Sequence, residues 1–291
     1  MKSSSGIGSF VRGTFFFLFF FFFVCLFVCL FEESPKWRFM SVFFVVTFLA
    51  LILAVLLQWQ RRSAALRPRI LGDVLLVFAH PDDEAMFFSP MLEHLRRYDV
   101  KVHFLCLSNG NYEGLGALRE KELGLSAQFM GVHRNNLKIV NHPALQDGMN
   151  KIWDAGLIRQ EVLLYLQKAR NVRTVVTFDQ WGVSHHPNHI ATHNGVSLVK
   201  ENMPPGIVFL SLRTRSLLGK YSGVLAAVQY MTNFGLLGHK HRFVFLVPPT
   251  SFLTSFLAMR LHRSQLVWFR YLFLAFSSYT YVNELEVLKA P

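Results

Sequence analysis

Two short clusters of metal-ligating and proton-transfer residues stand out in this sequence. Ala79-His-Pro-Asp-Asp-Glu84 directly follows an apolar run, and His186-Pro-Asn-His189 lies in a second polar stretch. Catalytic zinc sites use three protein ligands, drawn from imidazole nitrogens, carboxylate oxygens and thiolates, and keep one position for water. His80, Asp83 and His189 supply two nitrogens and one oxygen. The two clusters together therefore predict a catalytic metal site.

Helix capping is the alternative explanation for the acidic run, because carboxylates favour a helix N-terminus. Ser89-Pro90, however, predicts a separate helix start several residues later. Capping would leave His80 and at least one aspartate unexplained. Two histidines and a carboxylate can also hold the iron of a non-haem oxygenase, but the additional carboxylate beside the ligand favours hydrolysis. His185 is expected to be a neighbour of the second cluster rather than a ligand.

Short apolar runs alternate with amphipathic stretches from Asp73 onward. The predicted strands are Asp73–Ala79, Lys101–Leu107, Leu137–Val140 and Arg173–Phe178. The predicted helices are Pro90–Tyr98, Leu115–Met130, Lys151–Arg170 and His189–Glu201. This alternation predicts an α/β fold, with a Rossmann-like, mostly parallel sheet and helices on both faces. Ligands of such sheets bind beyond the carboxyl ends of the strands, where both clusters lie.

The N-terminal part of the chain is apolar enough to form a membrane anchor. Residues 14–31 and 39–60 are uncharged apolar runs, each long enough to cross a bilayer. The first could instead be the apolar region of a signal peptide, although no small-residue cleavage site follows it. We expect an anchor of one or two spans within 1–60, a basic linker over 61–72, and a catalytic domain over 73–291.

Charge distribution predicts which side of the membrane the domain faces. The arginines between Arg61 and Arg69 outnumber the two basic residues, Lys36 and Arg38, that precede the second run, so the positive-inside rule places the domain in the cytosol. The net charge of +12 could suggest nucleic-acid binding. Because the clearest basic cluster adjoins a span, attraction to anionic lipid headgroups is the simpler explanation, and no nucleic acid is expected.

Two further features bear on the compartment and on the last part of the chain. The chain has 3 cysteines, too few for a disulfide framework or a cysteine-rich zinc site, which suits a cytosolic domain. Phe243–Val247, Ser251–Met259 and Leu266–Phe276 are apolar but too short or too interrupted for clear membrane spans. We expect this C-terminal segment to pack on the domain or to lie at the lipid interface.

The two clusters resemble those of the PIG-L and LmbE-like zinc-dependent de-N-acetylases. Three more stretches, Ser108–Tyr112, Arg119–Leu123 and His262–Arg270, resemble the eukaryotic members, which act on N-acetylglucosaminyl-phosphatidylinositol. The resemblance implies Zn²⁺ or another divalent metal as the cofactor. It also implies a membrane lipid-linked sugar as the substrate, and hydrolysis of an acetamide to acetate and a free amine early in GPI-anchor biosynthesis.

The resemblance also implies roles for individual residues. His80, Asp83 and His189 would hold the metal, Asp82 would act as general base, and His186 would assist the oxyanion. A carboxylate that is not committed to a metal can take a proton from water, which agrees with the division of roles between the two aspartates.

One position departs from the pattern of bacterial relatives, which commonly carry aspartate at the position of Asn188. An amide can orient a nearby imidazole but adds no charge that favours its protonated form. His186 would then depend on another acid, such as Asp179, or be less fully protonated at neutral pH.

Three residues are weaker candidates for substrate binding. Arg119 is either a substrate ligand, as the resemblance implies, or a solvated ion pair with Glu122 three residues along the same helix. Asn109 and His262 lie in the other stretches that carry the resemblance.

The predicted anchor and the resemblance together imply a deacetylase of the endoplasmic reticulum membrane that faces the cytosol and acts at the bilayer. No feature of the sequence identifies a protein partner. The alternatives are a deacetylase of another N-acetyl amino sugar and a non-catalytic membrane scaffold. The complete set of acids and histidines argues against the scaffold, because a binding module has no need of it.

Overall fold

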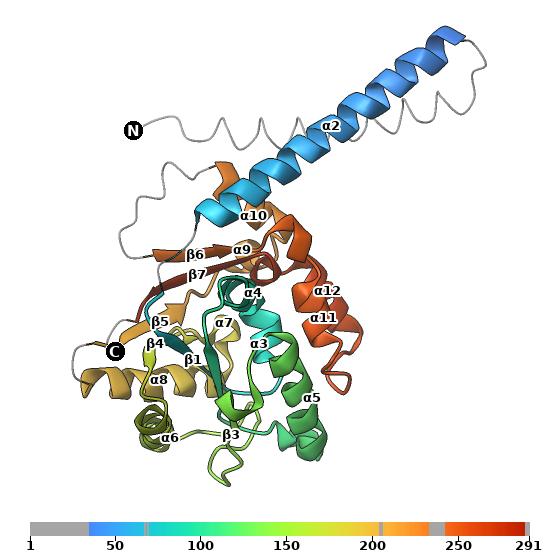
Figure 1. Cartoon of the computed structure of the whole chain (residues 1–291). Helices are drawn as coiled ribbons and strands as arrows, with labels where there is room; N and C mark the ends of the chain where they lie inside the picture. Colours follow the sequence, from blue (N-terminus) through green and yellow to red (C-terminus); the bar gives the residue numbers. More distant parts are fainter. Residues whose placement is uncertain (1–34, 67, 69, 204–205, 233–241, 289–291) are drawn as a thin grey trace, which may run out of the picture. The chain divides into compact units, whose positions relative to one another are not determined.

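The computed structural model describes residues 35–66, 68, 70–203, 206–232 and 242–288, with the backbone alone for 35–41 and 232 (Figure 1). The chain divides into two compact units, Met1–Arg61 and Arg62–Pro291. The first contains most of helix α2, and the second contains the sheet and both predicted clusters.

Helix α2, Pro35–Ala65, is the one helix in the described residues that is long and apolar enough to cross a membrane. A proline begins it, as is common where the first N–H groups have no helical partner. The stretch of membrane length runs from Val42 to Ala65, and few of its side chains are buried. The predicted span 39–60 lies within α2 and is consistent with a transmembrane segment. The other predicted run, 14–31, lies outside the described residues.

One sheet of seven strands, in the order β3-β2-β1-β4-β5-β7-β6, organises the second unit. Strands β1 to β5 are parallel, and β7 and β6 are antiparallel additions at one edge. The strands are β1 (Asp73–Phe78), β2 (Val102–Cys106), β3 (Leu137–Ile139), β4 (Val172–Phe178), β5 (Val208–Leu212), β6 (Arg242–Leu246) and β7 (Val282–Val287). The predicted mostly parallel α/β sheet is confirmed, and the first four strands match their predicted ranges to within one residue.

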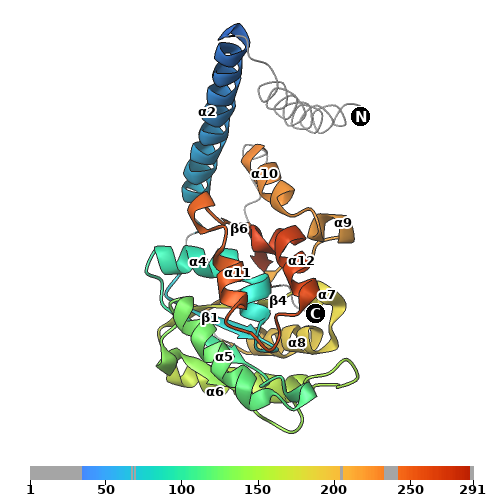
Figure 2. The same ribbon diagram turned by 90° about the vertical axis from the view of Figure 1, so that its right-hand side faces the viewer.

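The central strands are apolar along their length because helices cover both of their faces. Every residue of β2 is buried, as are Val74 to Phe78 of β1. Helices α6 (Ala155–Lys168) and α8 (Pro187–Glu201) pack together on one face, while α4 (Ser89–Arg97) and α5 (Gly116–Phe129) lie on the other (Figure 1, Figure 2). Short helices α3 (Asp83–Phe87) and α7 (Gly182–His185) follow β1 and β4.

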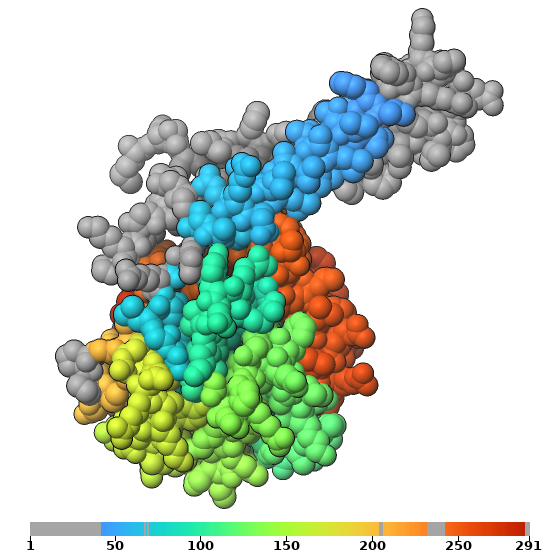
Figure 3. All heavy atoms as spheres, in the orientation of Figure 1, coloured from blue at the N-terminus to red at the C-terminus, as the bar shows by residue number. Residues whose placement is uncertain are grey.

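The chain after β5, which includes the C-terminal segment, forms the antiparallel edge of the sheet and several short helices. Its elements are α9 (Leu217–Lys220), α10 (Val224–Thr232), η4 (Pro249–Ser251), α11 (Thr254–Met259), α12 (Trp268–Phe276) and η5 (Ser278–Thr280), and the remaining turns of helix are η1 (Asn111–Glu113) and η2 (Arg134–Asn136). Helix α11 packs against α3, α4 and α5, and atoms of this orange segment border those of green α5 at the surface (Figure 3). The expectation that part of this segment packs on the domain is therefore confirmed.

Strands β5, β6 and β7 are not among the predicted strands, and the sequence of β7, VNELEV, carries two glutamates. Glu284 is buried and accepts hydrogen bonds from Tyr230 Oη at 2.5 Å and from Arg213 Nη1 at 3.2 Å, and Arg242 Nη1 lies 2.8 Å away. Burying a charge requires partners of this kind. Two arginines and a tyrosine from other elements pair with the Glu284 carboxylate, so the strand forms despite its charged residues.

Candidate active site

The two predicted clusters meet beyond the carboxyl ends of neighbouring strands β1 and β4. His80 follows β1, while His186 and His189 stand at the start of α8, which follows β4. One ring nitrogen of each of these three histidines lies within 4.8 Å of the others, an arrangement that could hold a metal ion. All three line a pocket of about 360 Å³.

An oxygen acceptor orients the ring of His80 and another orients that of His189. His80 Nε2 lies 3.1 Å from Asn188 Oδ1 and 3.1 Å from Asp147 Oδ1. His189 Nδ1 lies 3.0 Å from the carbonyl oxygen of Gly182. Amide, carboxylate and backbone carbonyl oxygens are hydrogen-bond acceptors. We therefore assign an N–H to each of these two ring nitrogens. The nitrogens left free to act as ligands are His80 Nδ1 and His189 Nε2.

Asp83 faces both free nitrogens. Its Oδ2 lies 3.8 Å from His80 Nδ1, and its Oδ1 lies 3.2 Å from His189 Nε2. Burial by itself would raise the pKa of Asp83, but the charge and hydrogen bond of His189 and the charge of His80 hold it well below its ordinary range. Metal-ligating histidines commonly donate their second ring N–H to an oxygen acceptor, as these two do. His80, Asp83 and His189 therefore offer donor atoms of the kind that a divalent metal takes, while the group whose ligand atoms lie together in the structure is that of the three histidines.

Asp82 lies outside that donor set and has a strained backbone. Its φ is 123°, a conformation that costs a non-glycine residue about 1–3 kcal/mol. Its Oδ2 lies 3.1 Å from Arg270 Nη2, and its Oδ1 lies 3.8 Å from Arg119 Nη2. Burial raises the pKa of Asp82, while the charges of Arg270 and Arg119 oppose that rise. A buried carboxylate with a raised pKa has the property that a general base requires.

Glu84, the last acid of the first cluster, joins the loop after β1 to the C-terminal segment. Glu84 and His262 are both fully buried, and Glu84 Oε1 lies 2.6 Å from His262 Nε2. Glu84 also accepts a hydrogen bond from Ser126 Oγ at 2.6 Å, and its Oε2 accepts the backbone N–H of Asp82 at 3.1 Å. Burial lowers the pKa of His262, but the charge and hydrogen bond of Glu84 outweigh burial and raise it. The pair is therefore a buried ion pair.

His186 borders the pocket, and no acidic side chain within the described part of the chain forms an ion pair with it. Its Nδ1 accepts the backbone N–H of Asn188 at 3.2 Å. Burial and the charges of the neighbouring histidines lower its pKa to about 4. Asp179, the acid considered as its partner, is instead bound to the N–H and hydroxyl of Thr214, each at 2.6 Å. Of the two expectations for His186, the structure supports incomplete protonation at neutral pH. Asn188 uses its amide oxygen to orient His80.

Arg119 lines the pocket and is almost completely buried. Its Nη1 donates to the carbonyl oxygen of Gly110 at 2.9 Å and to Asp147 Oδ2 at 3.2 Å, and its Nη2 donates to the carbonyl oxygen of Pro81 at 2.6 Å. The alternative of a solvated ion pair with Glu122 is wrong, because Glu122 is bound to the C-terminal segment instead. Arg119 therefore forms hydrogen bonds to the loops that follow β1, β2 and β3.

Asn109 and His262 are not among the described residues that line the pocket. The side-chain amide of Asn109 donates to Glu120 Oε1 at 3.0 Å. His262 has no exposed surface and pairs with Glu84. In this structure both side chains hold neighbouring elements together and neither reaches the cavity.

Among the residues that line the pocket and were not predicted, three carry an acidic or basic side chain: Asp147, Lys220 and Arg270. Asp147 lies in the loop after β3, so the rule that ligands bind at the carboxyl ends of strands pointed to that loop. Arg270 ends a stretch that carried the family resemblance, although no role was assigned to it. No signal in the sequence marked Lys220, whose pKa is lowered by burial.

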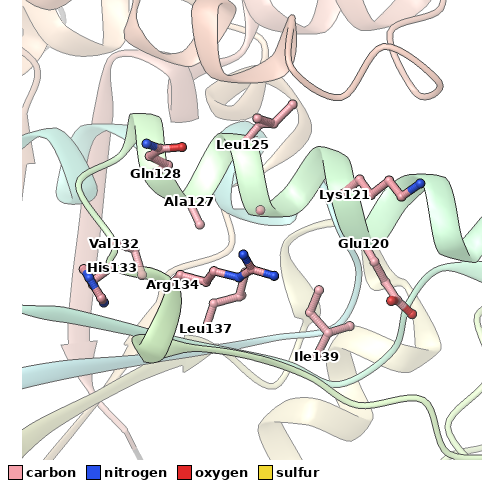
Figure 4. Close-up of a pocket in the computed structure, with 11 residues that line it drawn as sticks. Glu120, Lys121, Leu125, Ala127, Gln128, Val132, His133, Arg134, Leu137 and Ile139 are labelled. Atoms are coloured by element: carbon pink, nitrogen blue, oxygen red, sulfur yellow. The ribbon is translucent and has the colours of Figure 1, made fainter.

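A larger hollow of about 800 Å³ lies between α5 and the segment from Val132 to Ile139 (Figure 4). Glu120 and Lys121 border it from the helix, and Arg134 borders it from the opposite side. None of the residues that line it belongs to the metal-ligand group found among the described residues. The chemistry of the lining therefore identifies the site, whereas volume does not.

The fold is similar to that of solved deacetylases. The A40926 pseudoaglycone deacetylase Dbv21 aligns with 76% of this chain and 98% of its own length, with a TM-score of 0.51 and 13% identity. The zinc-inhibited form of teicoplanin deacetylase Orf2 aligns with 73% of this chain and 97% of its own, with a TM-score of 0.51 and 12% identity. At this level of identity the likeness concerns the fold alone.

Sequence similarity identifies the family. Residues 75–200 match the family described as PIG-L: GlcNAc-PI de-N-acetylase. The chain is 35% identical over 247 residues to a probable N-acetylglucosaminyl-phosphatidylinositol de-N-acetylase of Schizosaccharomyces pombe, covering 84% of this chain and 98% of that protein. It is 36% identical over 246 residues to the N-acetylglucosaminyl-phosphatidylinositol de-N-acetylase of Bos taurus, covering 82% and 94%. The chain therefore belongs to the PIG-L family of GlcNAc-PI de-N-acetylases.

Proposed function

We propose that this chain hydrolyses the acetamide of N-acetylglucosaminyl-phosphatidylinositol, giving acetate and glucosaminyl-phosphatidylinositol, an early step of GPI-anchor biosynthesis. Family membership supports the reaction class, and the names of the relatives support the substrate. The observation that best supports this reaction is the difference between the surroundings of two adjacent aspartates. Asp83 faces two imidazole nitrogens, whereas Asp82 is free of them and borders the same pocket.

Zn²⁺ is the proposed metal, with His80, Asp83 and His189 as its ligands. Two imidazoles and a carboxylate form a common ligand set of catalytic zinc, and the second ring nitrogen of each histidine already faces an oxygen acceptor. When bound there, the ion would lower the pKa of a coordinated water and polarise the acetamide carbonyl.

Asp82 is the proposed general base. Its carboxylate would accept the proton of the attacking water and then return it to the sugar nitrogen as the C–N bond breaks. Arg270 and Arg119 oppose the rise in its pKa that burial causes, so they favour the ionised form that can accept a proton. The strained backbone and the Glu84 contact to its N–H hold the side chain in place.

His186 is the proposed hydrogen-bond donor to the carbonyl oxygen. Because its Nδ1 accepts the N–H of Asn188, the neutral ring carries its proton on Nε2. A neutral N–H can stabilise the negative charge that develops on the oxygen in the transition state. A lowered pKa of about 4 is compatible with this role, which does not require an imidazolium.

The proposed organisation is an anchor within 1–60, a basic linker over 61–72 and a catalytic domain over 73–291 at the cytosolic face of the endoplasmic reticulum. Helix α2 provides one apolar segment of sufficient length. The arginines that follow it support the orientation. A tether of this kind would keep the enzyme at the surface that holds a lipid-linked substrate.

The decisive experiment compares adjacent aspartates in membranes that carry the wild-type chain, Asp82→Asn or Asp83→Asn. Acetate release from N-acetylglucosaminyl-phosphatidylinositol is measured on the membranes, and bound zinc is measured on the protein purified from each of them. We expect Asp82→Asn to lose activity by at least about 100-fold while it retains zinc, because general-base catalysis contributes about 10²–10⁴-fold. Asp83→Asn should lose both zinc and activity. Wild-type membranes that bind zinc but release no acetate would refute the proposed reaction.

A further inference from the structure

Apolar side chains are concentrated on the exposed side of the C-terminal segment. We call six of them the apolar rim: Leu217 and Leu218 on α9, Leu225 on α10, and Trp268, Leu272 and Phe276 on α12. Leu218 is 88% exposed and Trp268 is 74% exposed. Large side chains of this kind rarely gather on a surface that faces only water.

The three helices that carry the rim pack around one element of the catalytic unit. Helices α9, α10 and α12 all pack against the same short turn, η5, and they lie near one another in Figure 2. Leu274 is the one buried residue of α12, so this nine-residue helix turns most of its apolar surface outward. A helix that is apolar on its outer face is usually covered by another apolar medium.

Two of the helices that carry the rim also contribute residues to the active-site pocket. Lys220 and Tyr221, at the end of α9, line the pocket from one side. Phe269, Arg270 and Phe273, on α12, line it from the other. The same two helices thus present aromatic and basic groups to the pocket and apolar groups to the outside.

We propose that the apolar rim docks the catalytic unit on a phospholipid bilayer. The pocket then opens toward the headgroups, and the sugar of a lipid-linked substrate enters it while the acyl chains stay in the membrane. This inference rests on the proposed function, which it deepens by assigning the surface that admits the lipid.

The composition of the surface favours a bilayer over a protein partner. Trp268 and Tyr271 are exposed, and amphipathic aromatic side chains of this type are enriched at the membrane–water interface. Arg260 and Arg263, in the connection between α11 and α12, are exposed and can attract anionic headgroups.

The first test compares two leucine-to-glutamate variants of the full chain reconstituted in phospholipid vesicles. Leu272→Glu places a charge in the rim, and Leu164→Glu places one on α6, where the leucine is 40% exposed. Neither residue lines the pocket. Each protein is assayed on N-acetylglucosaminyl-phosphatidylinositol in the vesicles and on the headgroup without acyl chains in solution.

We expect Leu272→Glu to lower kcat/KM on the vesicle substrate by about tenfold or more, because one leucine no longer enters the lipid. Its activity on the soluble headgroup should remain, and Leu164→Glu should change neither activity. Equal loss on both substrates, or no loss on either, would overturn the inference. If the wild type deacetylates neither substrate, the proposed function fails, and docking is decided by the second test.

The second test needs no activity. Brominated phospholipids quench tryptophan fluorescence on contact, and the difference between the wild type and Trp268→Phe isolates one of the 5 tryptophans of the chain. We expect brominated vesicles to quench that difference signal strongly. A Trp268 signal that aqueous acrylamide quenches and brominated lipid does not would show an uncovered rim. A Trp268 signal that neither quencher reduces would show that protein, and not the bilayer, covers this side chain. Either of these two results would overturn the inference.

Discussion

Replacing His262 with alanine should test how the C-terminal segment is joined to the loop that carries Asp82. His262 and Glu84 have no exposed surface, and their side chains approach to 2.6 Å. His262→Ala leaves the Glu84 carboxylate buried without its cationic partner, a change that costs about 3–5 kcal/mol. The hydrogen bonds from Ser126 and from the Asp82 N–H remain. We therefore expect a loss at the lower end of that range.

The assay is chemical unfolding of the purified full chain in detergent micelles at about pH 6, followed by tryptophan fluorescence. His133→Ala is the control, because His133 is exposed and its side chain accepts one hydrogen bond, from the N–H of Asn135. Loss of this hydrogen bond should lower the free energy of unfolding by about 1 kcal/mol. A His262→Ala loss no larger than that of the control would refute the conclusion that the pair is a buried ion pair.

The same pair predicts how stability depends on pH. In the folded chain the pKa of His262 lies above its unfolded value of about 6.5. The pair is therefore fully stabilising below about pH 6.5, and its contribution is lost as pH rises through the folded pKa. The stability difference between wild type and His262→Ala should shrink over that interval. A difference that grows with rising pH would contradict the assignment of charge.

Three further predictions concern the site. Arg270→Met should move the acidic limb of the kcat/KM profile to higher pH, because the charge that lowers the pKa of Asp82 is gone; an unmoved limb in a folded variant would exclude this role. Asp147→Ala should weaken zinc binding by about 10–100-fold in a competition titration, because His80 Nε2 loses an acceptor, whereas unchanged affinity would assign Asp147 elsewhere. Removing metal with a chelator should abolish acetate release and Zn²⁺ should restore it, and activity that survives complete removal would rule out a metal-dependent site.

The sequence alone predicted the first four strands, the longer helices between and after them, and the reaction class. Strands such as Asp73–Phe78 could be located because a parallel strand covered on both faces must be continuously apolar, a purely local property. The position of His80 and His189 at one edge followed from the rule that ligands bind at the carboxyl ends of parallel strands. Local spacing and one topological rule were enough for these conclusions.

Long-range packing decided what the sequence left open. Arg270 reaches Asp82 only because a buried ion pair, His262 with Glu84, fastens the C-terminal segment beside the loop after β1. Glu284 lies in a strand because distant arginines neutralise it. Charged side chains are ambiguous in a sequence, since the same residue is solvated or buried according to which partner the fold brings to it. The sequence determined which groups can do chemistry, and the tertiary structure decided which of them meet.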